Sequence, residues 1–208
     1  MEIPQVFQSG ELKLEGLIQI PQTKEDKMAA VVLCHPHPLY GGNMHNNVVV
    51  AVSQALVERG IVALRFNFRG VGFSEGRFDD GNGEQDDLRA AVLTLPDHPE
   101  VDPDRLGVMG YSFGGMVALS AVKSCQSVRV IVAVSPVVTP GLLQGLNKPA
   151  YFICGTKDHV VSADLLVREV EKMIPPGQVE LLPGADHFWS GREAEMANKV
   201  AAFFDKAL

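Results

Sequence analysis

Residues 104–124, DRLGVMGYSFGGMVALSAVKS, predict a strand, a sharp turn and a helix in immediate succession. Apolar residues fill 106–109, the turn GYSFG follows at 110–114, and small or apolar side chains continue over 115–122. In a G-x-S-x-G turn the serine adopts a cramped backbone conformation, so its neighbours must carry little side chain. The turn lifts the Ser112 hydroxyl off the sheet, where free N–H groups at the helix N-terminus are placed to stabilise an oxyanion.

The five-residue motif is weak evidence by itself. At this composition it arises by chance in roughly one chain in ten, and the alternative is a glycine-rich loop carrying a surface serine. The apolar strand before Ser112 and the helix after it supply the structural context that the motif requires. Ser112 is therefore the candidate nucleophile.

Composition limits the class of protein. The chain has 208 residues, 46% hydrophobic and 21% charged, which predicts one globular domain over 1–208 with a substantial core. A net charge of −7 and a pI near 5.3 argue against a nucleic-acid partner. The longest apolar runs have the length of strands and fall short of the roughly 20 residues of a membrane span, so no membrane partner is expected.

Two further observations suggest a compartment. The first ten residues, MEIPQVFQSG, lack the basic start and apolar segment of a signal peptide. The three cysteines, Cys34, Cys125 and Cys154, fit no disulfide framework and lie in apolar contexts typical of reduced thiols. We expect a cytoplasmic protein, either a monomer or a homodimer.

Hydrophobic patterning predicts eight strands and five helices. The strands are expected at 2–8, 11–20, 28–34, 61–66, 106–109, 128–134, 150–154 and 178–182. The helices are expected at 45–59, 84–95, 113–125, 162–174 and 191–207, with a polar loop at 21–27. Asn82 and Gln85 form a plausible capping box for the second helix. The first two strands form an antiparallel hairpin, and the strict alternation afterwards predicts parallel strands with helices on both faces.

In such α/β sheets, binding sites form at the carboxyl ends of the strands. The loops that matter are then 35–43, 67–76, 110–114, 135–148, 155–161 and 183–190. Asp102 and Asp104 precede their strand, which places them at the wrong end of the sheet for catalysis.

A serine nucleophile needs a base, and the base needs an orienting partner. His187 lies in LLPGADHFW after the last strand, and Asp158 lies in FICGTKDHVV after the preceding one. The chain order Ser112, Asp158, His187 is the order of one known class of serine triads. The rival candidates are Asp186, Asp164 and His159.

These motifs carry a resemblance. The turns GYSFGG, GTKDHVV and GADHFW are similar to those of the α/β-hydrolase superfamily. The segments HPHPLYGGNMHN and LRFNFRGVGFSEG closely resemble small predicted hydrolases related to dienelactone hydrolases and serine esterases. The resemblance spans nearly the whole chain and implies an α/β-hydrolase fold. Dienelactone hydrolases proper carry a cysteine nucleophile, whereas this chain has Ser112.

The oxyanion site should draw one N–H from Phe113 and a second from the loop after strand 28–34. Pro36 and Pro38 have no N–H, so His37 is the natural second donor. In the family that the chain resembles, the donor follows the loop histidine by one or two residues, which His37 matches. Leu39 and Tyr40 are the alternatives.

Other motifs in the chain have weaker functional interpretations. His35, His37 and His45 lack acidic partners nearby, so no metal is expected. The glycines of 70–76 do not make a dinucleotide motif, and DDGNGEQDD lacks calcium-loop spacing and predicts a solvated loop and helix start. No cofactor is expected. Four aromatic residues are candidates to line an acyl pocket, with core or rim packing as the alternative: Tyr40, Tyr111, Phe188 and Trp189.

The residues together favour a serine hydrolase that cleaves small carboxylic esters through an acyl-enzyme. A thioesterase, a small peptidase and a non-catalytic ligand-binding protein on the same scaffold are the alternatives. The segment PVVTPGLLQGLNKP at 136–149 is too short for a cap domain. We therefore expect an open pocket that prefers short, water-soluble esters.

Overall fold

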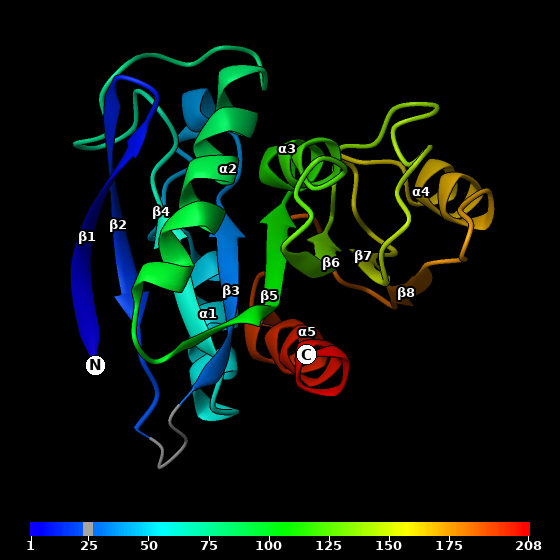
Figure 1. Cartoon of the computed structure of the whole chain (residues 1–208). Coiled ribbons are helices and arrows are strands. Elements are labelled where there is room, and N and C mark those ends of the chain that lie inside the picture. Colours follow the sequence, from blue (N-terminus) through cyan, green and yellow to red (C-terminus); the bar gives the residue numbers. More distant parts are fainter. Residues whose placement is uncertain (23–26) are drawn as a thin grey trace.

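The computed structural model describes residues 1–22 and 27–208, and its eight strands form one sheet in the order β1-β2-β4-β3-β5-β6-β7-β8 (Figure 1). Most of the polar loop expected at 21–27 lies outside the described residues. The strands are Glu2–Ser9 (β1), Leu12–Gln19 (β2), Met28–Cys34 (β3), Val62–Phe66 (β4), Val101–Tyr111 (β5), Val128–Val134 (β6), Ala150–Gly155 (β7) and Gln178–Leu182 (β8).

The sheet is mixed in the way the sequence predicts. β1 pairs antiparallel with β2, β2 pairs antiparallel with β4, and every other neighbouring pair is parallel. β1 alternates exposed residues with half-buried or buried ones, as expected for an edge strand, whereas β3 and β4 are buried at every position. The eight-stranded, mostly parallel sheet with an N-terminal hairpin is confirmed.

Helices cover both faces of the sheet (Figure 1). They are Asn47–Glu58 (α1), Gly83–Thr94 (α2), Phe113–Ala121 (α3), Ala163–Glu171 (α4) and Glu193–Ala207 (α5), with short 3₁₀ turns at Pro38–Tyr40 and Leu95–Asp97. α1 and α5 pack together in one buried core, and α2, α3 and α4 bury side chains in the other. Among the described residues, no helix combines the length and apolarity needed to cross a bilayer.

The segment between β6 and β7 decides how open the site is. Residues 135–149 contain turns but neither a helix nor a strand. No cap domain is therefore inserted there, as the short segment predicts.

Two predictions are wrong, the starting residue of β5 and the capping box of α2. β5 begins at Val101, where it pairs with Met28, so Asp102 and Asp104 lie inside the strand rather than before it. They still lie at its amino end, away from the site. At α2 the Asn82 side chain makes no capping bond. The carboxylate of Asp79 accepts the N–H of Gly83 instead, at 3.0 Å.

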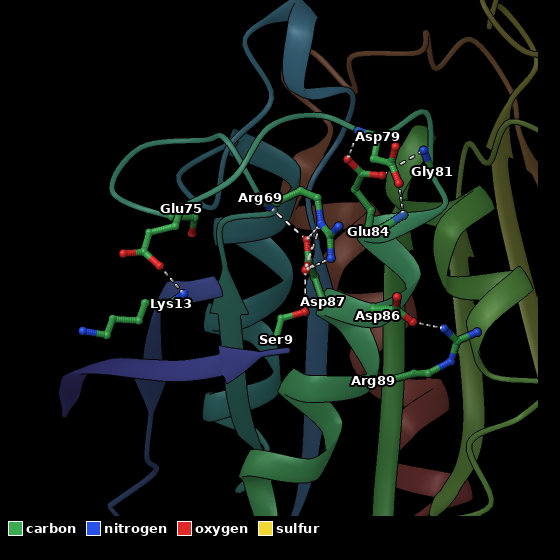
Figure 2. A network of polar contacts seen from close by, with 12 residues as sticks. Ser9, Lys13, Arg69, Glu75, Asp79, Gly81, Glu84, Asp86, Asp87 and Arg89 are labelled. Carbon is green, nitrogen blue, oxygen red and sulfur yellow. Dashed lines mark hydrogen bonds and ion pairs between the residues drawn. The ribbon is translucent and has the colours of Figure 1, made fainter. Parts of the chain in front are cut away.

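The acidic stretch 79–87 also differs from the prediction of a solvated loop (Figure 2). Glu84 and Asp87 are both fully buried. The Glu84 carboxylate accepts the N–H groups of Asp79 and Gly81 at 2.9 and 2.8 Å. Their burial is tolerated because each carboxylate oxygen has a donor.

Asp87 is the centre of the second half of this network (Figure 2). It accepts the Ser9 hydroxyl at 2.7 Å and pairs with the guanidinium of Arg69 at 2.8 Å. Together with Glu84 it fixes the long loop 67–82 to α2. That loop carries Phe78, whose ring lies 4.9 Å from the ring of His37 at the edge of the site described below.

Candidate active site

Ser112 occupies the turn between β5 and α3. Its φ of +56° and ψ of −117° are values that L-residues rarely adopt, as the G-x-S-x-G motif predicts. The neighbouring glycines allow very close packing. A Cβ on Gly110 would lie 2.2 Å from the carbonyl oxygen of Gly114, and one on Gly114 would lie 2.4 Å from that of His35. The turn therefore lies directly against the loop that follows β3.

The structure brings the three residues predicted as a triad into one hydrogen-bonded line. His187 Nε2 lies 3.0 Å from Ser112 Oγ, and His187 Nδ1 lies 2.9 Å from Asp158 Oδ2. All three follow strands at their carboxyl ends: β5, β7 and β8. The side chain of Asp158 is fully buried and that of His187 is 7% exposed, so solvent screens their interaction little.

Asp158 is held as a carboxylate. Burial works to raise its pKa, but the hydrogen bond from His187 and those from the amides of Val161 and Val160, each 3.0 Å, hold that pKa below its ordinary value. The rival acids lie elsewhere. Asp164 lies in α4, and the Asp186 carboxylate accepts the N–H of Ser190 at 3.3 Å.

Tyr111 has a role that the sequence does not reveal. Its hydroxyl donates to the backbone carbonyl of His187 at 2.8 Å, and its ring lies 5.5 Å from the imidazole. Burial, followed by the nearby charges of Asp158 and Asp186, raises its pKa well above the ordinary value, so the hydroxyl keeps its proton. Tyr111 therefore holds the loop that carries His187.

The amide N–H groups of His37 and Phe113 have no hydrogen-bond partner among the described residues. The two alternatives are occupied. The N–H of Leu39 donates to Nδ1 of His37 at 3.2 Å. The N–H of Tyr40 donates to the carbonyl oxygen of His37 at 3.1 Å. Of the three candidates, His37 is therefore the one whose N–H is free among the described residues.

Below this loop, His35 is a structural residue. It is fully buried, accepts the N–H of Phe68 at Nε2 (3.1 Å) and lies 2.6 Å from the Pro36 carbonyl through Nδ1. Those contacts set the neutral tautomer with its proton on Nδ1. The Pro36 carbonyl belongs to the same planar peptide as the His37 N–H, so His35 fixes the direction of that donor. Within the described residues, no three potential metal ligands gather.

A cavity of about 400 Å³ opens beside Ser112. Tyr40, Tyr111 and Phe188 contribute to its wall, as predicted. Its complete lining is Pro36, His37, Tyr40, Gly41, Gly42, Asn46, Tyr111, Ser112, Val160, His187 and Phe188. Sequence reasoning missed five of these: Pro36, Gly41, Gly42, Asn46 and Val160. The position of Asn46 as a helix N-cap is the one signal that could have drawn attention to it.

Trp189, also predicted to line the pocket, does not. It is fully buried, and its indole N–H donates to Ser135 Oγ at 3.2 Å. Its φ of +59° turns the chain directly after Phe188, which stays 61% exposed. Two neighbouring aromatic residues thus face opposite environments, and Trp189 belongs to the core.

Comparison with known proteins places the chain in a family. A serine hydrolase homologue from Coxiella burnetii superposes with a TM-score of 0.86 at 33% identity, over 97% of this chain and 96% of that one. A serine hydrolase without a lid from Xanthomonas campestris superposes at 0.87 with 28% identity, over 99% and 94%. An uncharacterized protein of Rickettsia prowazekii is 33% identical over 95% of this chain and 87% of its own. The family model for dienelactone hydrolases matches residues 14–205, and the chain belongs to the dienelactone hydrolase family.

Proposed function

We propose that this protein is a serine hydrolase that cleaves small, uncharged carboxylic esters. The observation that carries the proposal is the hydrogen-bonded line Ser112–His187–Asp158, with contacts of 3.0 and 2.9 Å, at the wall of an open cavity. A protein that only binds ligands has no need of a buried carboxylate behind the histidine. Ester hydrolysis uses all three groups.

Each group then has a step. Ser112 Oγ attacks the ester carbonyl while His187 Nε2 takes its proton, and Asp158 stabilises the imidazolium that forms. The N–H groups of Phe113 and His37 hold the oxyanion of the tetrahedral intermediate. His187 then protonates the leaving alcohol, which departs and leaves an acyl group on Ser112. Water, deprotonated by His187, attacks that acyl group and releases the carboxylic acid.

The residues that line the cavity support a preference for neutral substrates. The ionisable side chains in its lining are those of two histidines and two tyrosines. The lining holds no lysine or arginine. A substrate with a carboxylate beside the ester would find no counter-charge there, so desolvating it would be costly. We therefore expect neutral esters to be preferred.

The open mouth of the cavity supports a preference for short acyl chains. Tyr40 is 88% exposed and Phe188 61%, and no cap covers them. Each CH₂ that is buried contributes only about 0.8 kcal/mol, and a chain that stays in water contributes nothing to transition-state binding. We therefore expect kcat/KM to peak at about two to six acyl carbons and to show no jump above the micellar concentration.

A panel of p-nitrophenyl esters from acetate to palmitate, with and without detergent, measures this preference. A maximum at long chains or clear interfacial activation would contradict the expectation that a long acyl chain stays in water. Thioesters and peptide amides in the same panel test the thioesterase and peptidase alternatives. Labelling of Ser112 by a fluorophosphonate tests catalysis itself, and a wild-type protein that takes no label under conditions that saturate a known esterase would contradict the proposal.

A further inference from the structure

A line of buried polar side chains continues behind Asp158. Trp189 Nε1 lies 3.2 Å from Ser135 Oγ, Ser135 Oγ lies 4.0 Å from Cys154 Sγ, and Cys154 Sγ lies 3.7 Å from Asp158 Oδ2. Trp189, Ser135 and Cys154 are all 0% exposed. None of the three lines the cavity, so the proposed reaction does not use them directly.

The direction of this line follows from chemistry. An indole N–H can only donate and a carboxylate can only accept, whereas a hydroxyl and a thiol do both. Ser135 accepts from Trp189 and its hydroxyl donates to Cys154 Sγ, which leaves the thiol of Cys154 free to donate to Asp158. Burial, followed by the charge of Asp158, raises the pKa of Cys154 to about 12, so the thiol keeps the proton that it donates.

The two ends of the line belong to the two loops that form the triad. Trp189 lies two residues after His187, in the loop that follows β8, and its φ of +59° is a strained value for a residue with a side chain. Cys154 lies in β7, four residues before Asp158. Ser135 follows β6, and its φ of +41° is also positive. Two unusual backbone conformations thus aim the indole and the hydroxyl at each other.

We infer that Cys154 and Ser135 are positioning residues for Asp158: the thiol shares the Oδ2 oxygen that faces His187, and the buried Trp189 is the anchor of the line. The thiol has one other acceptor within reach, the carbonyl oxygen of Gly155 at 3.7 Å, and the inference requires that it donates to Asp158. The contacts themselves exist without substrate. Only their role in catalysis rests on the proposed function.

The effect has a defined sign. A donor to Asp158 Oδ2 draws charge away from the carboxylate that faces His187 Nδ1. Without that donor, the carboxylate holds the protonated imidazole more strongly, so the midpoint at which the His187 ring titrates rises. Loss of one weak hydrogen bond to a charged group corresponds to a rise of about half a pH unit.

The test compares four single variants, and the double variant Cys154→Ala/Ser135→Ala, with the wild type. Cys154→Ala removes the thiol, Cys154→Ser restores a donor, and Ser135→Ala removes the group behind it. Cys34→Ala is the matched control, because Cys34 is an equally buried thiol at the end of β3 that makes no hydrogen bond to the triad among the described residues. The primary readout is the ring-proton titration of His187 by NMR, assigned by comparison with His187→Gln.

We expect the midpoint to rise by about half a unit in Cys154→Ala and by less in Ser135→Ala. It should return to within about 0.2 unit in Cys154→Ser and stay unchanged in Cys34→Ala. In the double variant, Ser135→Ala should add nothing to the shift of Cys154→Ala, because it acts through the thiol. If Cys154→Ala fails to fold, the shift in Ser135→Ala decides alone.

Two results would overturn the inference. If the midpoint does not move in the Cys154 and Ser135 variants, the thiol donates to the carbonyl oxygen of Gly155 and not to Asp158. If Cys34→Ala shifts the midpoint equally, the cause is a general loss of packing. The chain has a single tryptophan, so its emission reports separately whether Ser135→Ala alters the anchor. Since neither readout uses a substrate, failure of ester hydrolysis would remove the proposed function and leave this inference testable.

Discussion

Acid should destabilise this protein through His35, which faces no solvent. The pKa of His35 is lowered from 6.5 to about 4, because burial penalises the charged ring more than the hydrogen bond to the Pro36 carbonyl favours it. The unfolded chain therefore binds more protons than the folded chain between these two values. Stability from the neutral ring is complete above pH 6.5 and is lost as pH falls toward 4.

The magnitude follows from the two values. With an unfolded pKa of 6.5 and a folded pKa of about 4, the free energy of unfolding falls by about 2 kcal/mol between pH 7 and pH 5 and by about 3 kcal/mol below pH 4. Total stabilities of single domains are of the order of 5–15 kcal/mol, so a loss of about 3 kcal/mol is a large fraction of the total.

Urea unfolding at pH 7 and pH 5, followed by the emission of the buried Trp189, measures this loss. His35→Gln should be less stable at pH 7 but should lose about 2 kcal/mol less than the wild type on acidification. His159→Gln is the control, because His159 is exposed and should leave the pH dependence unchanged. Parallel losses in the wild type and His35→Gln would refute the reasoning.

Three other substitutions test the site. Ser112→Ala should lower ester turnover by a factor of the order of 10⁴–10⁶ with little change in Tm, and retention of more than about a tenth of the rate would indicate another nucleophile. Tyr111→Phe removes the hydroxyl that holds the carbonyl of His187, so kcat should fall about tenfold while KM stays similar; an unchanged kcat would show that the loop is held without it. Gly114→Ala places a Cβ 2.4 Å from the His35 carbonyl oxygen and should lower the free energy of unfolding by about 1–3 kcal/mol; unchanged urea unfolding would contradict that contact.

The fold could be predicted because its signals are local. Apolar runs of strand length, helical spacing and the GYSFG turn each depend on neighbouring residues. They also place Ser112, Asp158 and His187, in that order, after predicted strands. Parallel pairing then brings the strand ends together whatever the loops contain. Three residues that are distant in sequence could therefore be predicted to meet at one edge of the sheet.

The errors arise where a partner lies far away in sequence. Asp87 looks like a solvated acid, yet its partners are Arg69, 18 residues earlier, and Ser9, 78 residues earlier. Trp189 and Phe188 are equally plausible as pocket residues, because a loop has no periodicity that separates inside from outside. The positive φ of Trp189 turns its side chain into the core and leaves Phe188 exposed, and no local sequence pattern predicts that turn.

The supporting residues explain how a site without a lid keeps its geometry. A lidded hydrolase can complete its site when the lid closes, whereas this chain has no such element between β6 and β7. Its loops must therefore be in place before substrate arrives. His35, Tyr111 and Trp189 each bury a polar atom that donates to a loop of the site: to Pro36, to His187 and to Ser135. Displacing any of these loops would leave a buried donor without an acceptor, at a cost of about 1–3 kcal/mol. The buried donors therefore keep the loops in position, as a closed lid does in a lidded hydrolase.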